Sequence, residues 1–294
     1  MIEKSHICAI CDLEINNQEK FEVGVARGTT ERFHNCNYRL WRCPNCETIQ
    51  SEDQVDYADL YNGYPLNDRR MDFVAFLTNA KVVWRLWKAG FRRHHSLLDF
   101  GCGNGAFVQT AKKLGYAQVR GFDPYVSAYA DEPTGKKFDW VVMNDVIEHT
   151  EKVREVLKNA GEFVKDGGYL YVGTPDVAEV EMNKLERHAM KLHQPFHRVI
   201  LSREMLKRLG KVGGFQPTKE WNRSYIDTLV PFVNYRFIEE VWRSVGNVMD
   251  RALDPAVGRK VLTSPRLLFF GFFGYFFASV QDRAVLFRKI AEAK

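Results

Sequence analysis

The sequence predicts an α/β fold in which a mostly parallel sheet follows a small metal-binding module. From residue 96 onward, strand patterns alternate with helical patterns, as crossover connections between parallel strands require. Two cysteine pairs, each spaced C-x-x-C, precede this region. A chain of 294 residues that is 45% hydrophobic can form one large domain with an appendage. We therefore expect three parts, with bounds at 1–51, 52–95 and 96–294.

The first part, residues 1–51, is predicted to be a zinc module. Cys8 and Cys11 form one pair, and Cys43 and Cys46 form the other; two such pairs complete a tetrahedral zinc site. Weak alternation between the pairs predicts short antiparallel strands, as in a zinc ribbon. So small a module buries little surface, so the metal would supply part of its folding energy. Cys36 is left over, either as a spare ligand or as a packing residue.

The second part, residues 52–95, is predicted to be a lid or linker followed by a long helix. Its first half is polar and carries Tyr57, Tyr61 and Tyr64. Tyr61 and Tyr64 could serve as acid/base groups over a bound ligand, or they could simply pack. Apolar residues then recur with helical spacing from Asp68 to Gly90, which predicts an amphipathic helix leading into the main domain.

The third part opens with a strand, a glycine turn and a helix. The strand at 96–100 ends at Gly101, Gly103 and Gly105, and a helical pattern then runs from Ala106 to Gly115. Such a turn lets a ligand approach the backbone, and the start of the helix offers unpaired N–H groups. The spacing G-x-G-x-G lacks the third glycine of a dinucleotide fingerprint, and no P-loop lysine follows. Asp123 ends the next strand, 118–122, where it can accept hydrogen bonds from a ribose.

Further strands and helices follow, but one expected pair is missing. Strands are predicted at 140–144 and 169–173, with a helix at 153–164 that closes at 166–168. Only 15 residues separate Asp123 from Asp139, whereas a crossover helix with another strand needs about 30. We therefore expect the third strand of the sheet to be absent or reduced.

These motifs together resemble class I S-adenosylmethionine-dependent methyltransferases over residues 70–215. The segment from Asp99 to Gly105, with Gly121 to Asp123, resembles their cofactor site, and Phe138 to His149 resembles their fourth-strand segment. The resemblance implies a Rossmann-like methyltransferase fold whose last strand, at 284–288, is antiparallel. An N-terminal zinc module also occurs in sugar C-methyltransferases, which this chain resembles in the order of its parts. The resemblance implies two cofactors, S-adenosylmethionine and structural zinc.

The same resemblance assigns cofactor contacts. Asp99 and the three glycines would hold the methionine end, Asp123 the ribose, and the segment after the fourth strand the adenosine side. The reduced third strand leaves the adenine contacts unassigned. The predicted cofactor-binding residues are Asp99, Phe100, Gly101, Cys102, Gly103, Asn104, Gly105, Asp123, Pro124, Asn144, Asp145 and Val146.

Methyl transfer to a hydroxyl or a carbon acid needs a general base, and His149 is the first candidate. It follows the carboxyl end of a strand, where ligands bind in open α/β sheets. Glu148 could orient His149 or act on the substrate; alternatively, the pair only caps the next helix. His193 and His197 are four residues apart, as in a metal pair on a helix, but Pro195 between them favours a loop over the acceptor pocket. A surface loop is the other interpretation.

We expect a cytoplasmic enzyme whose small-molecule acceptor is a sugar, with a lipid-like or quinone acceptor at a membrane surface as the alternative. The apolar segment 267–280 is too short to span a bilayer, and we expect it to be a helix packed on the sheet; the alternative is an apolar face at a membrane surface. The chain from Arg198 onward carries 17 Lys/Arg against 9 Asp/Glu. The segment between Cys8 and Cys46 contains five basic and five acidic residues, and this charge balance argues against a nucleic-acid-binding module.

Overall fold

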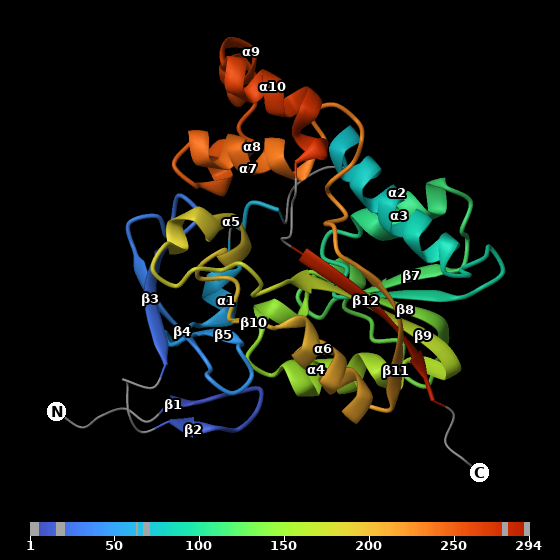
Figure 1. Cartoon of the computed structure of the whole chain (residues 1–294). Helices are drawn as coiled ribbons and strands as arrows, with labels where there is room; N and C mark the ends of the chain where they lie inside the picture. The colour runs from blue at the N-terminus through green and yellow to red at the C-terminus, as the bar shows by residue number, and fades with distance from the viewer. Residues whose placement is uncertain (1–5, 16–20, 63, 67–70, 278–281, 291–294) are drawn as a thin grey trace.

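The computed structural model describes residues 6–15, 21–62, 64–66, 71–277 and 282–290, and its centre is a six-stranded mixed sheet (Figure 1). The strand order is β11-β12-β9-β8-β6-β7, in which only β12 runs antiparallel to its neighbours. This confirms the predicted Rossmann-like fold with its antiparallel last strand. The strands are β6 (Leu97–Phe100), β7 (Val119–Phe122), β8 (Phe138–Asn144), β9 (Val164–Pro175), β11 (Phe215–Trp221) and β12 (Asp282–Lys289).

Alternate residues of the central strands serve two separate cores. Val141 and Met143 of β8 pack with helices α4 (Val153–Glu162) and α6 (Arg203–Val212) on one face. Trp140 and Val142 pack on the other face with α2 (Phe73–Lys88) and α3 (Ala106–Lys113). Both faces of the sheet are therefore covered, as the near-continuous apolar run of β8 requires.

The sheet ends at β7, and no further strand follows it between residues 123 and 137, all of which the structure describes. A single 3₁₀ turn, Ser127–Tyr129, takes the place of the missing crossover. The prediction of a reduced third strand is confirmed, because the short spacing left no room for it.

The predicted helix at 153–164 is shorter than expected, and the strand after it begins earlier. Helix α4 ends at Glu162, whereas Val164 is already paired with Phe138 and fully buried. Gly167, with φ of 74°, lies within β9 and does not close the helix. The expected start of the preceding long helix at Asp68 lies outside the described residues; α2 begins at Phe73, capped by Asp72.

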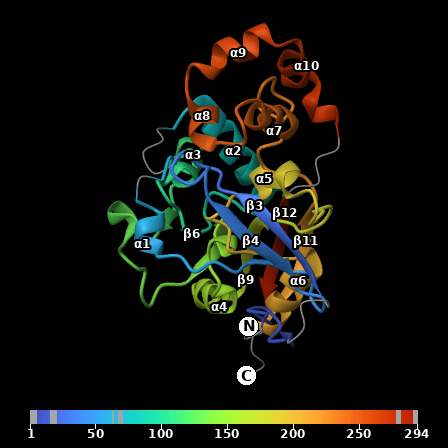
Figure 2. The same cartoon turned by 90° about the vertical axis from the view of Figure 1, so that its left-hand side faces the viewer.

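The N-terminal part forms two small antiparallel sheets beside the main one (Figure 2). Strand β10 (Val199–Ile200), which comes from the main domain, completes the larger of them in the order β10-β5-β4-β3. Helix α1 (Tyr57–Leu60) follows β5, and residues 185–192 form a 3₁₀ turn and helix α5 (Ala189–Leu192). The N-terminal strands are β1 (His6–Ile7), β2 (Glu14–Ile15), β3 (Glu22–Arg27), β4 (Asn37–Arg42) and β5 (Ile49–Ser51).

Four helices between β11 and β12 form a cap above the sheet (Figure 1). The apolar segment 267–280, described to Phe277, contributes helix α10, which packs on α7 and not on the sheet. Its last residues, 278–280, lie outside the described residues. The cap helices are α7 (Tyr235–Ser244), α8 (Met249–Leu253), α9 (Val257–Thr263) and α10 (Pro265–Phe273).

Candidate active site

The glycine turn links β6 to α3 at the carboxyl end of the sheet. Gly101, Gly103 and Gly105 all have left-handed backbone, with φ of 75°, 51° and 76°. A Cβ on Gly103 would meet nothing within 4 Å, so this backbone faces open space. A Cβ on Gly105 would lie 2.0 Å from the hydroxyl of Tyr129, so glycine is required there for packing.

Two carboxylates lie beside this turn. Asp123 accepts hydrogen bonds from the backbone N–H groups of Gly103 and Tyr125, both at 2.9 Å, and so ties the ends of β6 and β7 together. Asp99 is 4% exposed. Its burial, with a smaller contribution from the charge of Asp123, raises the pKa of the Asp99 carboxyl to about 8. Asp99 is therefore largely protonated at neutral pH until a cation approaches it.

Other predicted cofactor residues differ in what their side chains reach. The Cys102 sulfur packs against Gly121, 2.7 Å from where a Cβ there would lie, and the ring of Phe100 packs 5.5 Å from that of Phe122. These two residues can therefore offer only backbone groups. Asn104 accepts a hydrogen bond from the N–H of Ala106 at the start of α3. Pro124 is exposed beside Asp123.

The residues after β8 face the same turn. The Val146 side chain occupies the space that a Cβ on Gly101 would need. Asp145 has φ of 55°, and it accepts hydrogen bonds from Asn144 at 2.9 Å and from the hydroxyl of Tyr225 at 2.7 Å. The carboxyl ends of β6, β7 and β8 thus converge around the glycine turn.

His149 closes a 3₁₀ turn, Ile147–His149, next to this edge. Its Nδ1 is hydrogen bonded to the Tyr61 hydroxyl at 2.7 Å. Burial lowers the pKa of His149 well below its usual value, the neighbouring His197 adds to this, and a hydrogen bond to the Phe196 backbone opposes it. Burial also raises the pKa of Tyr61. The pair is therefore a neutral phenol and a neutral imidazole.

The segment from His193 to His197 is a turn, as Pro195 predicts; His197 lies against His149, and His193 lies against His197. The ring centroid of His197 is 4.8 Å from that of His149 and 5.2 Å from that of His193. His197 donates from Nδ1 to the Lys191 carbonyl at 2.7 Å, which leaves Nε2 as its acceptor. His193 is hydrogen bonded to Thr29 through Nδ1, at 2.7 Å, and to the Tyr64 hydroxyl through Nε2, at 3.0 Å.

Burial dominates the electrostatics of these two imidazoles. It lowers the pKa of His197 to about 4, against an opposing hydrogen bond to the Lys191 backbone. It also lowers the pKa of His193, with smaller contributions from His197 and His149. All three imidazoles of the cluster are therefore neutral at physiological pH.

Glu148 is fully buried and accepts a hydrogen bond from the Thr174 hydroxyl at 3.0 Å. Helix α4 starts later, at Val153, and its N-cap residue, Lys152, makes no side-chain cap bond. Glu148 and His149 therefore do not cap that helix. An oxygen of Glu148 and one nitrogen each of His149 and His197 lie within 4.8 Å of one another.

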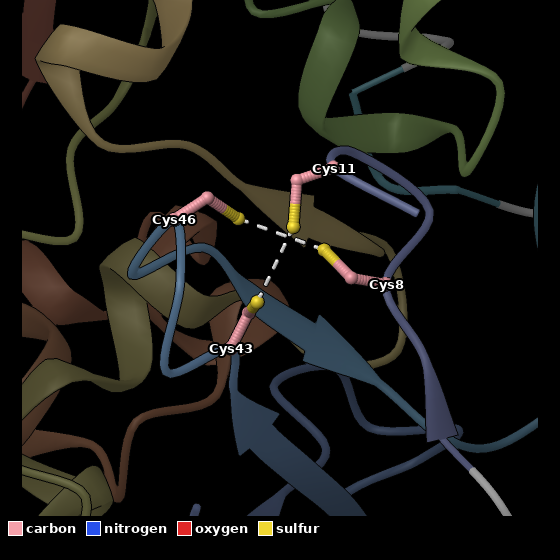
Figure 3. A group of neighbouring side chains, drawn as sticks. All are labelled: Cys8, Cys11, Cys43 and Cys46. Carbon is pink, nitrogen blue, oxygen red and sulfur yellow. Dashed lines mark hydrogen bonds between the residues drawn. The ribbon is translucent and has the colours of Figure 1, made fainter. Parts of the chain in front are cut away.

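The four paired cysteines meet at one point, as their spacing predicts (Figure 3). Their sulfurs point toward one another from two turns, with 3.6 Å between Cys8 and Cys46 and between Cys11 and Cys43. Four thiolates around zinc at about 2.3 Å would lie about 3.8 Å apart. The donor set thus fits a tetrahedral zinc ion. Cys36 is exposed and is not part of this group.

Several contact residues escaped the sequence analysis. Thr29 belongs to the N-terminal module and yet bonds His193. Trp242 of α7 lies 5.8 Å from the His193 ring, and Tyr125 stacks 6.5 Å from Tyr61. None has a local signature, because each contact joins segments far apart in the chain. Tyr125 alone could have been suspected, because it lies two residues after the predicted cofactor residue Asp123.

Comparison with known proteins places the chain in a family. A family model described as a methyltransferase domain matches residues 67–220. Two ubiquinone biosynthesis O-methyltransferases match, at 29% identity over 101 residues in Methylobacterium sp. strain 4-46 and at 30% over 100 residues in Azorhizobium caulinodans. These matches cover 27% and 26% of this chain. They span only 40% and 39% of the two relatives.

Solved structures resemble the fold at low identity. A SAM-dependent methyltransferase from Archaeoglobus fulgidus has 18% identity and a TM-score of 0.44, covering 80% of this chain and 100% of that one. The cyclopropane synthase MmaA2 from Mycobacterium tuberculosis has 15% identity and a TM-score of 0.47, covering 71% and 83%.

Proposed function

Since the chain belongs to the methyltransferase-domain family, we propose that it is an S-adenosylmethionine-dependent methyltransferase and that it methylates a hydroxyl or a carbon acid of a small acceptor, with His149 as general base. The acceptor we propose is a sugar, either nucleotide-linked or part of a surface glycan or natural product.

One observation supports this proposal above the others: the neutral imidazole of His149 lies in contact with the phenol of Tyr61 beside the glycine turn. Tyr61 is hydrogen bonded to His149, and its ring stacks on that of Tyr125, whose backbone N–H donates to Asp123. A base must be unprotonated before the reaction, and burial keeps His149 so. The Glu148 carboxylate, within 4.8 Å, would stabilise the imidazolium that forms when His149 takes a proton.

The residues around the glycine turn fit S-adenosylmethionine. Gly103 faces open space, Asp99 can pair with a cationic ammonium, and each oxygen of Asp123 retains a lone pair for a ribose hydroxyl. When bound, the cofactor supplies an electrophilic methyl group on a sulfonium. The task of the protein is then to align the acceptor and to remove its proton.

The remaining side chains suit an acceptor with several hydroxyl groups. His193, His197, Tyr61 and Tyr64 are four polar aromatic side chains that line one region of the site. Phe196 lies between them, 4.6 Å from Tyr64 and 5.8 Å from Tyr61. Among the polar groups of this region, Nε2 of His197 is left as an acceptor that could bind a hydroxyl of a sugar.

Zinc is proposed as a structural ion held by Cys8, Cys11, Cys43 and Cys46. Gln50 donates to the Cys8 sulfur at 3.2 Å, an outer contact that orients a ligand. No catalytic role is assigned to this ion, because all four positions of a tetrahedral site would be filled by thiolates.

Replacing His149 by Ala tests the base. We expect kcat to fall by about 10²–10⁴-fold while the Kd for S-adenosylmethionine stays within twofold. His34→Ala is the matched control, since among the described residues this partly exposed imidazole bonds within its own turn, to the Glu31 carbonyl and carboxylate. Product would be followed by mass spectrometry with labelled cofactor and a panel of sugar nucleotides. Undiminished turnover in the His149 variant would exclude it as the base.

A lipid-like or quinone acceptor is the second candidate. Two observations favour it: the exposed phenylalanines of α10 and the names of the two relatives, both of ubiquinone biosynthesis. Adding demethylated quinone precursors in detergent to the same panel decides between the candidates, because only one class should give a labelled product.

A further inference from the structure

The cap helix α10 has one face turned inward and one turned to solvent. Its inward face is made of glycine and leucine: Leu267 is buried, and a Cβ on Gly271 would lie 2.3 Å from the ring of Phe232. The turn that follows is equally close, since a Cβ on Gly274 would meet the Asn234 side chain at 2.1 Å. The glycines therefore seat the helix on α7, and its large rings have to point outward.

The outward face is almost entirely aromatic. Three of its rings form a connected group, with centroids of Phe269 and Phe273 5.4 Å apart and those of Phe269 and Phe277 5.9 Å apart. Side chains this large are rarely left half exposed in a group unless the surface has a partner. This aromatic face consists of Phe269 (47% exposed), Phe272 (53%), Phe273 (52%), Phe276 (74%) and Phe277 (42%).

The charged residues in the segment that carries the aromatic face are all basic. From Pro255 to Gln281 the sequence contains Arg259, Lys260 and Arg266 but no Asp or Glu. All three basic residues are exposed, and the side chain of Arg266 is 65% exposed although it pairs with Glu240. An aromatic surface bordered by cations matches an anionic lipid bilayer, in which rings enter below the headgroups and cations meet the phosphates.

The position of this face favours the bilayer over other partners. Helix α10 packs on α7, and Trp242 of α7 lies 5.8 Å from the His193 ring of the acceptor site. A bilayer bound to the aromatic face would therefore be separated from the histidine cluster by the layer of helix α7. None of the described helices is long and apolar enough to cross a membrane.

We propose that the enzyme docks on anionic bilayers through α9 and α10, with the aromatic face inserted at the level of the lipid headgroups. Docking is independent of the acceptor, so its failure would leave the proposed methyl transfer untouched. It would place the acceptor site at a membrane surface, where lipid-linked substrates of either proposed class are found.

Vesicle flotation of the full chain tests the docking. Vesicles of phosphatidylcholine with 30% phosphatidylserine should carry at least tenfold more protein than pure phosphatidylcholine vesicles. The double variant Phe273→Glu with Phe276→Glu should lose more than tenfold of this binding. The matched control is Val25→Glu with Val212→Glu, two exposed apolar residues (55% and 82%) outside the cap, which should bind within twofold of wild type.

Two further measurements keep the result unambiguous. The cap variant must retain the wild-type melting temperature and affinity for S-adenosylmethionine, so that lost flotation reports the surface and not unfolding. Light scattering without vesicles examines the alternative partner, a second copy of the chain. Wild type that fails to float, equal flotation of the cap variant, or a wild-type dimer that the cap substitutions dissociate would each overturn the proposal.

Discussion

Binding of S-adenosylmethionine should release a proton from Asp99. This carboxyl is 4% exposed, and burial beside Asp123 raises its pKa to about 8. At pH 7 a group of that pKa is about nine tenths protonated. A bound ammonium favours the carboxylate, so binding at pH 7 should release about 0.9 proton per cofactor.

Calorimetry measures this release directly. Titrations at pH 7 in phosphate and in Tris differ in buffer ionisation enthalpy, and the slope of observed heat against that enthalpy gives the number of protons released. Between pH 6 and pH 7 the ionised fraction of Asp99 rises about tenfold, so the apparent Kd should fall by the same factor. The sign follows from the raised pKa: as the pH falls below 8, a larger fraction of Asp99 is protonated, and binding has to displace that proton.

Two variants isolate the source of the proton. Asp99→Asn should bind more weakly and release none, while Asp123→Asn should lower the pKa of Asp99 and reduce the release. A slope of zero for the wild-type protein, with measurable binding heat, would refute the assignment of Asp99 to the cationic end of the cofactor.

Three other predictions concern the scaffold. By elemental analysis, wild type should contain one zinc per chain, and Cys43→Ser should lose this zinc and have a lower melting temperature. A second equivalent of zinc in wild type would instead indicate a metal at Glu148, His149 and His197. Thr29→Val should cost about 1–3 kcal/mol of unfolding free energy and slow turnover, because it removes the hydrogen-bond partner of the buried His193 Nδ1. The control Thr30→Val should be neutral in both respects, since that buried hydroxyl has no hydrogen-bond partner within the described residues; equal effects of the two would argue against the Thr29 contact. Gly105→Ala should weaken cofactor binding and cost more stability than Gly135→Ala, which has the same left-handed backbone (φ of 70°) but open space around it; equal denaturation midpoints would contradict the predicted clash with Tyr129.

Local patterns in the sequence predicted the sheet and the meeting of the four paired cysteines. Each C-x-x-C pair and the glycine turn are motifs of a few residues, and the short spacing before Asp139 can be counted directly in the sequence. The meeting of sulfurs and the missing third strand follow from these spacings alone. Helix and strand ends were less predictable, as at Val164, because strand pairing with Phe138 overrides the local pattern.

Contacts between distant segments could not be predicted in the same way. Thr29 reaches His193 across 164 residues, and nothing in a single sequence marks such a pair. The cap was also missed as a layer, since the apolar run at 267–280 has the same composition whether it packs on a sheet, on a helix or on lipid. What the structure adds is the direction of its faces, inward at Gly271 and outward at Phe273.

Pairing of β10 with β5 also has a consequence for how this chain folds during synthesis. Ile200 pairs with Ile49, 151 residues earlier, and Arg198 donates to the Ser51 hydroxyl at 2.8 Å. The N-terminal sheet therefore stays incomplete until two thirds of the chain has left the ribosome, although its four cysteines emerge first. Zinc available during translation would hold the two cysteine turns together over that interval. Metal supplied only after release would have to rescue thiols that had been exposed throughout.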